Sequence, residues 1–482
     1  MKESVELAIA HLKKRGVDYA DARCVDSREE KIQIRGEKVE NIADETSRGI
    51  GIRVLDNGAW GFASTSELSE AEVTACADRA LEIARASALT TIDKAQLDDR
   101  PPEQGAWKSP RDIDPFSVSL GDKVGLLIAA CRILGRDERV TSAKGRMKAT
   151  RDLKYYTDTE GAALEQDILH CGAIIEVIAE KDGEVQNRSF PCSHEGDWAA
   201  AGYEWIEGLG LIENAEQVRE EAVALLTAPE CPVGEYDLII GGAQLALQIH
   251  ESCGHPTELD RAMGTEISLA GGSFMTPDRL GKLQYGSKKV NLYGDSTTPC
   301  GMGTFGWDDE GVPGQRFDIV KEGLFVGYQT SRETAKKLGQ RSNGTMRADG
   351  WARIPLIRMV NVNLAPDPKG PGLDELIADT KRGLYLEVNK SWSIDDLRLN
   401  FSFGCESARL IENGRFGPVV KNPVYTAITP QFWNACDAVC NESAWRVWGV
   451  ANCGKGQPMQ SMHVGHACSA ARFRNIQVGR KK

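Results

Sequence analysis

The chain has 482 residues and a net charge of −12, because 58 Lys and Arg stand against 70 Asp and Glu with His taken as neutral. Its 41% hydrophobic and 27% charged residues are typical of globular proteins and exclude a largely disordered chain. At about 150 residues per domain, the length indicates roughly two to four domains. The acidic balance argues against direct binding of nucleic acid or of an anionic membrane, since either needs a basic face.

The sequence indicates neither a membrane span nor an export signal. Its longest apolar stretches, such as 124–131, fall far short of the roughly 20 residues that a span needs. Residues 1–16 predict an amphipathic helix rather than a signal peptide, because Glu3 and Glu6 would interrupt an apolar core. The 13 cysteines follow no framework spacing, so we expect reduced thiols in a cytoplasmic protein.

The first half predicts strands that are interrupted by capped helices. Strands are expected at 31–45, 49–55, 59–63, 141–159, 167–180 and 185–191. Helices are expected at 69–86, 122–134 and 214–228. Capping boxes are expected to open the first of these helices at Ser69 and the last at Asn214.

A break follows at Pro229 and Pro232, because proline ends a helix and restricts the residue before it. We therefore divide the chain into an N-terminal domain, 1–229, and a C-terminal domain, 232–482. The second part is richer in Gly, and its strands are expected at 236–240, 290–293, 316–328, 353–364, 383–388 and 397–406. Its helices are expected at 243–253, 372–382 and 430–440.

Strands cluster along the chain instead of alternating regularly with helices, which predicts an α+β fold. We expect an N-terminal domain of mixed strands and amphipathic helices. We expect the strand-rich C-terminal domain to carry a metal site.

The strongest chemical signal is the run His250-Glu251-Ser252-Cys253-Gly254-His255, which holds two of the seven histidines. Two neutral imidazoles can bind Zn²⁺, and a nearby carboxylate can take a proton from water that the metal acidifies. Two hydrogen-bonded histidines at a helix end would show the same pattern. The position directly after a predicted strand and a Gly-Gly turn favours the metal interpretation.

The spacing of the two histidines differs from the common zinc-peptidase pattern, in which they lie four residues apart on one helix face. Five steps of about 100° leave two side chains about 140° apart on a straight helix. Pro256 disfavours helical backbone at His255. We therefore expect the helix to end near Cys253 and His255 to swing back from its last turn.

Several segments together resemble the TldD/PmbA family of modulators of DNA gyrase, and specifically its metal-bearing TldD-type subunit. They are the H-E-x-x-x-H run, W-D-D-E-G-V-P at 307–313, R-M-V-N at 358–361, L-I-E-N-G at 410–414 and N-C-G-K at 452–455. Their order and spacing fit the family over nearly the full chain.

The resemblance implies a cytoplasmic zinc metallopeptidase that hydrolyses peptide bonds in unfolded or small peptides. It implies His250, His255 and Cys453 as Zn²⁺ ligands and Glu251 as the base that activates water. It further implies a homodimer, or a heterodimer with a related metal-free subunit. A catalytically silent, peptide-binding subunit is the alternative, and an adaptor that affects DNA topology is a third interpretation that the net charge of −12 disfavours.

Other residues invite a metal or binding interpretation. His463, His466 and Cys468 could replace or supplement a ligand, or orient one, although surface or hydrogen-bonded histidines are the plainer reading. Cys436 and Cys440 lie four residues apart on an expected helix, where buried packing is commoner than a metal pair. The Asp308–Glu310 run is expected to form a solvated turn. Arg347 and Arg358 could hold a peptide carboxylate or form structural ion pairs.

Overall fold

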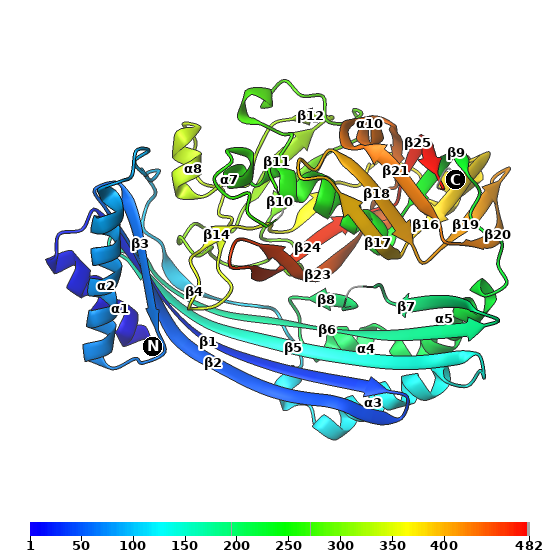
Figure 1. Ribbon diagram of the computed structural model, residues 1–482, viewed down its shortest axis with the longest axis horizontal. Coiled ribbons are helices and arrows are strands. Elements are labelled where there is room, and N and C mark those ends of the chain that lie inside the picture. The colour runs from blue at the N-terminus through cyan, green and yellow to red at the C-terminus, as the bar shows by residue number, and fades with distance from the viewer. Residues whose placement is uncertain (194, 270, 480–482) are drawn as a thin grey trace.

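The computed structural model describes residues 1–193, 195–269 and 271–479 (Figure 1). Its α-helices are α1 (Lys2–Lys14), α2 (Glu70–Ala88), α3 (Leu120–Leu134), α4 (Tyr203–Gly208), α5 (Leu211–Leu225), α6 (Gly242–Ile249), α7 (Leu259–Ala262), α8 (Arg332–Lys337), α9 (Leu373–Ala378) and α10 (Thr429–Asn434). No helix in these ranges is long and apolar enough to span a bilayer.

The first half forms one long, curved sheet, with strand order β3-β2-β1-β5-β6-β4 and with β7 and β8 paired to β6. The strands are β1 (Tyr19–Arg35), β2 (Lys38–Asp56), β3 (Ala59–Thr65), β4 (Gln104–Lys108), β5 (Val140–Asp158), β6 (Ala163–Lys181), β7 (Glu184–Phe190) and β8 (Asp197–Ala199). Four of them run for 17 to 19 residues. Figure 1 shows the second half of the chain lying along the inner, concave side of this sheet.

The two faces of the long sheet differ in character because side chains alternate along each strand. Ala22 and Cys24 of β1 pack in an apolar cluster with α1 and α2, on the face that also carries α3 and α5. Asp21 and Arg23 point the other way. Arg23 donates to main-chain carbonyls of the segment 350–353 at 2.9 and 3.2 Å. The sheet therefore meets the second half through a largely polar face.

The second half is built around a larger sheet, with strand order β17-β18-β21-β25-β9-β16-β19-β20 and with β22 paired to β25. Its strands are β9 (Gly234–Ile240), β16 (Arg382–Leu386), β17 (Asn389–Ile394), β18 (Asn400–Cys405), β19 (Ser407–Glu412), β20 (Arg415–Lys421), β21 (Val424–Ile428), β22 (Cys436–Val439) and β25 (Ala471–Val478). The remaining strands are β10 (Leu292–Asp295), β11 (Arg316–Lys321), β12 (Leu324–Phe325), β13 (Met346–Arg347), β14 (Leu356–Ile357), β15 (Val362–Leu364), β23 (Arg446–Lys455) and β24 (Gln460–Cys468).

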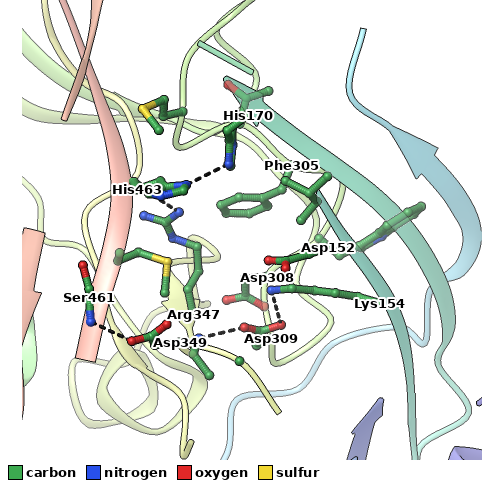
Figure 2. A pocket seen from close by; sticks show the side chains of 17 residues that line it. Asp152, Lys154, His170, Phe305, Asp308, Asp309, Arg347, Asp349, Ser461 and His463 are labelled. Carbon is green, nitrogen blue, oxygen red and sulfur yellow. Dashed lines mark hydrogen bonds and ion pairs between the residues drawn. The ribbon is translucent and has the colours of Figure 1, made fainter. Parts of the chain in front are cut away.

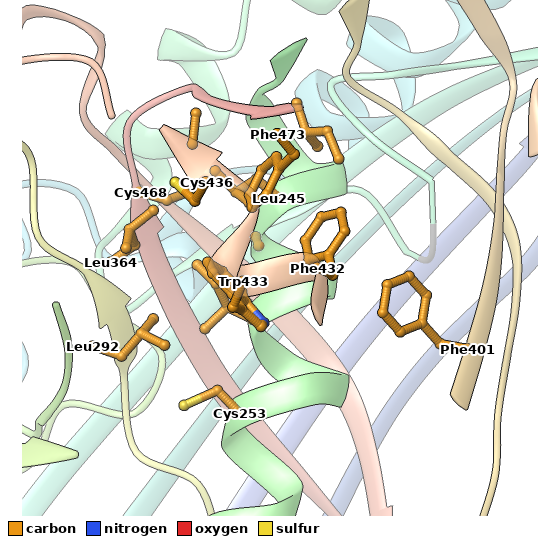
Figure 3. Packing of buried hydrophobic residues seen from close by; sticks show 14 of the residues in the cluster. Leu245, Cys253, Leu292, Leu364, Phe401, Phe432, Trp433, Cys436, Cys468 and Phe473 are labelled. Carbon is orange, nitrogen blue, oxygen red and sulfur yellow. The ribbon is translucent and has the colours of Figure 1, made fainter. Parts of the chain in front are cut away.

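Helix α6 crosses the main core of the second half (Figure 3). It follows β9 through Gly241 and Gly242, and the φ of +53° at Gly242 favours glycine there. Leu245 faces a stack of aromatic side chains that includes Phe432 and Phe473, whose ring centroids lie 4.0 Å apart. One side of α6 is thus fixed in the core, which holds its other side toward the β23–β24 hairpin.

The structure confirms the α+β class and corrects several elements. The strand expected at 31–45 is a hairpin, since β1 ends at Arg35 and β2 begins at Lys38. Helix α5 begins at Leu211, so Asn214 lies within its first turn and donates to the Gly210 carbonyl at 2.8 Å instead of capping it. Ser69 precedes α2, but its side chain makes no capping hydrogen bond. The helix expected at 430–440 ends at Asn434, because the chain then pairs with β25 as β22.

Candidate metal centre

The backbone changes its winding at the histidine motif. Helix α6 ends at Ile249, and the chain continues as a π-helical turn, His250–Gly254. In such a turn each N–H bonds the carbonyl five residues earlier, and the His255 N–H donates to the His250 carbonyl. Five residues therefore make one turn, and the two imidazole centroids lie only 4.8 Å apart. The expectation that His255 leaves the helix and swings back is wrong, because His255 keeps helical backbone (φ −62°, ψ −46°) and the wider turn aligns the two histidines.

Neighbouring groups support this turn. Thr257 Oγ1 donates to the carbonyls of Cys253 and Gly254 at 2.7 and 3.0 Å, and Gln329 Nε2 donates to the Gly254 carbonyl at 2.8 Å. These donors satisfy main-chain acceptors in a buried segment, where an unpaired carbonyl is costly. A Cβ at Gly254 would lie 2.0 Å from Met359 Sδ, so only glycine lets the backbone approach so closely.

Cys453, on β23, completes a group of three possible ligands with His250 and His255. Cys453 Sγ lies 3.7 Å from His255 Nε2, and the ligand atoms of the three residues lie within 4.8 Å of one another. Bonds of about 2.0 Å to nitrogen and about 2.3 Å to sulfur would place tetrahedral ligands about 3.5 Å apart. Two imidazoles and a thiol therefore fit a zinc-like ion with one position left for water or substrate. All three side chains are buried.

Hydrogen bonds orient the metal-facing nitrogen of each imidazole. His255 Nδ1 donates to Glu258 Oε2 at 3.1 Å, which leaves Nε2 free toward Cys453. His466 Nδ1 donates to the Val362 carbonyl at 2.8 Å, so its neutral ring can only accept at Nε2. His250 Nδ1 lies 2.8 Å from that nitrogen and therefore donates to it. The Nε2 lone pair of His250 is thus also available to a metal.

The protonation states suit metal binding. Burial lowers the pKa of His250 to about 4 and the pKa of His466 well below its usual value, so both rings are neutral near pH 7. Burial raises the pKa of the Cys453 thiol, but His255 and the Arg358 guanidinium outweigh burial and leave that pKa below its usual value. Neutral imidazole and thiolate are the forms that bind metals.

The partner of His255 belongs to a buried network of charges. Glu258 lies 3.2 Å from Arg261 and 3.5 Å from Lys455, which in turn lies 2.8 Å from Asp260. Burial raises the pKa of Glu258, but Lys455, His255 and Arg261 together hold it well below its usual value. Glu258 is therefore an ionised acceptor that fixes the His255 ring.

Glu251 projects from the same turn into a cavity beside the group. Its Oε2 lies 2.6 Å from Arg398 Nη1, and each side chain is only 7% exposed. Arg398 lies between β17 and β18 with a φ of +64°. The cavity has a volume of about 260 Å³ and is also lined by His250, His255 and Cys453. A carboxylate, an open cavity and three metal-type donors therefore meet in one place.

Most of the other candidate residues from the sequence lie away from the metal group. Of the three residues near the C-terminus, only His466 contacts the group, as a hydrogen-bond partner of His250. His463 points to the long sheet, where its Nδ1 lies 2.9 Å from His170 Nδ1. Cys468 and Cys436 are packed in the main core, as Figure 3 shows, and Cys440 belongs to a separate buried cluster. All 13 cysteines are free thiols.

A second, smaller cavity of about 100 Å³ lies where the long sheet meets the second half (Figure 2). Asp308 and Asp309 line this cavity, and all three carboxylates of the run 308–310 are buried, so the expected solvated turn is wrong. Asp308 accepts main-chain hydrogen bonds from Glu310, Val312 and Met346, while Lys154 lies 3.5 Å from Asp309. The Asp309–Lys154 pair thus joins the two halves, while Asp308 orders the main chain of its own loop. These carboxylates form no metal-type cluster among the described residues.

The two arginines considered from the sequence, Arg347 and Arg358, donate hydrogen bonds to main-chain carbonyls. Arg347 donates to the His463 carbonyl at 2.8 Å and to the Met359 carbonyl. Arg358 donates to the Gln460 carbonyl at 3.1 Å and to the Cys453 carbonyl. Arg358 therefore fixes the strand that carries the thiol. Neither arginine forms an ion pair within 4 Å among the described residues.

Two residues at the site, Glu258 and Arg398, are not predicted by the sequence motifs. Glu258 follows His255 by three residues, a helical spacing that could have indicated a hydrogen-bond partner. Arg398 is separated from Glu251 by 147 residues. No local pattern links the two, because only the hairpin between β17 and β18 brings the guanidinium to the cavity.

Three family models match the chain in order: PmbA/TldA metallopeptidase domain 1 over residues 20–84, the central domain over 113–226 and the C-terminal domain over 233–480. The last match covers more than half of the sequence. The chain therefore belongs to the PmbA/TldA metallopeptidase family.

Curated relatives carry matching names. A metalloprotease of Methanocaldococcus jannaschii is 27% identical over 93% of this chain and 94% of its own. A protein of Saccharolobus solfataricus named zinc metalloprotease TldD homolog is 20% identical over 83% of this chain and 84% of its own. These names support a metallopeptidase.

Solved structures share the fold. A putative modulator of a DNA gyrase from Thermotoga maritima has a TM-score of 0.78 at 19% identity and covers 99% of both chains. TldE from Thermococcus kodakarensis has a TM-score of 0.73 at 15% identity over 99% of this chain and 100% of its own.

Proposed function

We propose that this protein is a zinc-dependent peptidase that hydrolyses peptide bonds in unfolded or small peptides. The observation that carries the proposal is the group of His250, His255 and Cys453 beside Glu251 in one cavity. A set of two imidazoles and a thiolate favours zinc over magnesium or calcium, which prefer oxygen ligands. Zinc is also the metal in the name of the Saccharolobus solfataricus relative.

The protein residues have distinct tasks in this reaction. Bound zinc would polarise the scissile carbonyl and lower the pKa of water. Glu251 takes a proton from the attacking water and passes it to the leaving nitrogen, so the amide is converted to a carboxylic acid and an amine. Arg398 Nη1 donates to Glu251 Oε2 at 2.6 Å and so holds the carboxylate in place. Glu258 and His466 fix the rings of His255 and His250.

The test compares the native protein with Glu251→Gln. Both are analysed for zinc by mass spectrometry and for cleavage of an unstructured, fluorogenic peptide, with and without added zinc. We expect about one zinc per chain in both proteins and cleavage that falls by about 10²- to 10⁴-fold in the variant. Full cleavage by zinc-loaded Glu251→Gln would remove the base assignment. Zinc without cleavage in the native protein would favour the peptide-binding subunit instead.

A further inference from the structure

The cavity beside the candidate metal centre has an apolar wall. Ala243, Ala246 and Leu247 line it from one face of α6, at the i, i+3 and i+4 positions. Trp448 and Val450 of β23 line it as well. An engineered apolar cavity of about 150 Å³ in another protein holds benzene. The volume of about 260 Å³ here therefore leaves room for a phenyl or isobutyl side chain.

Four exposed apolar side chains lie near lining residues of the cavity, and we call them the rim: Met459, Leu269, Leu397 and Ile267. A Cβ built on Gly454, which lines the cavity, would meet Met459 Sδ at 3.2 Å and Leu269 Cδ2 at 3.6 Å. Met459 is 57% exposed and Leu269 is 44% exposed. Both side chains therefore lie beside Gly454, a lining residue of the cavity, and are exposed to solvent.

Two side chains of the rim lie near the loop between β17 and β18. Leu397 directly precedes Arg398, which lines the cavity, and it is 51% exposed. Leu397 and Ile267 both lie beside Gly272. A Cβ built on Gly272 would lie 3.9 Å from Leu397 Cδ2 and 4.0 Å from Ile267 Cγ2. Ile267 is also 51% exposed. Exposed apolar side chains that gather near a cavity mark a binding surface, whereas scattered ones do not.

We propose that the cavity is a subsite for one large apolar or aromatic side chain next to the scissile bond, and that the rim binds further apolar residues of the same peptide. This inference rests on the proposed peptidase function and adds its substrate class. Leu, Ile, Val and Phe side chains are mostly buried in folded proteins. A subsite that requires such a side chain would therefore select unfolded chains, because only these expose many of them. This selection would act in addition to any steric limit on entry to the cavity.

Two measurements test the subsite. The first compares kcat/KM for fluorogenic peptides that carry Phe, Leu, Ala or Glu at each position flanking the cleaved bond. We expect a preference for Phe or Leu over Ala of at least about tenfold at one of the two positions. The second measures binding of the same peptides to zinc-loaded Glu251→Gln by fluorescence anisotropy, where no cleavage is needed. Equal binding and equal cleavage of all four peptides would overturn the subsite.

Variants assign the preference to the cavity. Leu247→Trp fills the cavity and should reduce the Phe-to-Ala ratio of kcat/KM to about one. Zinc content by mass spectrometry and circular dichroism check that the variant is folded and loaded. Met459→Ser should weaken binding of peptides with several apolar residues. The matched control is Leu120→Ser, a change at a 43% exposed leucine on α3 outside the cavity, and it should match the native protein.

The outcomes separate the two proposals. Apolar preference in the binding assay without cleavage of any peptide would retain the subsite and refute the peptidase. Cleavage with an unchanged Phe-to-Ala ratio in Leu247→Trp would retain the peptidase and refute the subsite.

Discussion

Replacing His466 by Phe is the most direct test of how the candidate metal centre is built. The chain from the Val362 carbonyl through His466 to His250 contains two hydrogen bonds of 2.8 Å. Phe keeps a planar ring of similar size but cannot accept a hydrogen bond. The buried Nδ1–H of His250 would then lose its acceptor, and the ring would be free to turn its lone pair away from the metal.

The expected loss of zinc affinity follows from two estimates. Leaving one buried donor unpaired costs about 1–3 kcal/mol. Removing the hydrogen-bond partner of a metal-binding histidine typically weakens metal affinity by about 10- to 100-fold, which is about 1.4–2.8 kcal/mol. The two ranges overlap, so we expect a rise in the zinc Kd of about 10- to 100-fold.

The assay is competition for zinc between the protein and a chromophoric chelator, with circular dichroism as a check on folding. His466→Gln is the rescue variant, because its amide oxygen can accept from His250, and it should recover part of the affinity. His463→Phe is the matched control on the same strand, since His463 contacts His170 rather than the metal group. A folded His466→Phe protein that binds zinc within about twofold of native affinity would refute the reasoning.

Three further predictions concern the same site. Cys453→Ala should lose most of its zinc in mass spectrometry, because only two protein ligands remain, and retention of a full zinc would exclude the thiol as a ligand. Arg398→Met should keep its zinc but lower kcat by about 10- to 100-fold, because Glu251 loses the partner that positions it; Arg398→Lys should restore part of kcat, and an unchanged kcat in Arg398→Met would contradict that role. Gly254→Ala should destabilise the protein by about 1–3 kcal/mol in urea unfolding, because the new methyl group meets Met359. Combined with Met359→Ala, it should cost less than the sum of the single losses, and strict additivity would exclude the clash.

Local sequence patterns predicted much of the fold. Helices α1, α2 and α3 lie where the apolar period places them. Gly16 follows α1 with a φ of +70°, which is common just after a helix end. The expectations failed where tertiary pairing overrode local preference. β22 replaces the end of an expected helix because β25 offers it a strand partner. Asn214 lies inside α5, although its sequence resembles a cap.

The candidate site was predictable only in part. The sequence indicates His250 and His255 by their motif and Cys453 through the family resemblance, and the structure brings these three residues together. Their roles as zinc ligands and the role of Glu251 stay predictions until metal and activity are measured. The division at 229–232, the cytoplasmic location and the homodimer or heterodimer also stay predictions.

The sequence alone determined the α+β class and the family to which the chain belongs. These properties depend on composition, local periodicity and short motifs, which can be read along the chain. Only the tertiary structure decided that a π-helical turn aligns histidines five residues apart, because the winding of a helix depends on what packs against Gly254. It also decided that Arg398 and His466 reach the site, since contacts over 147 and 216 residues leave no local pattern.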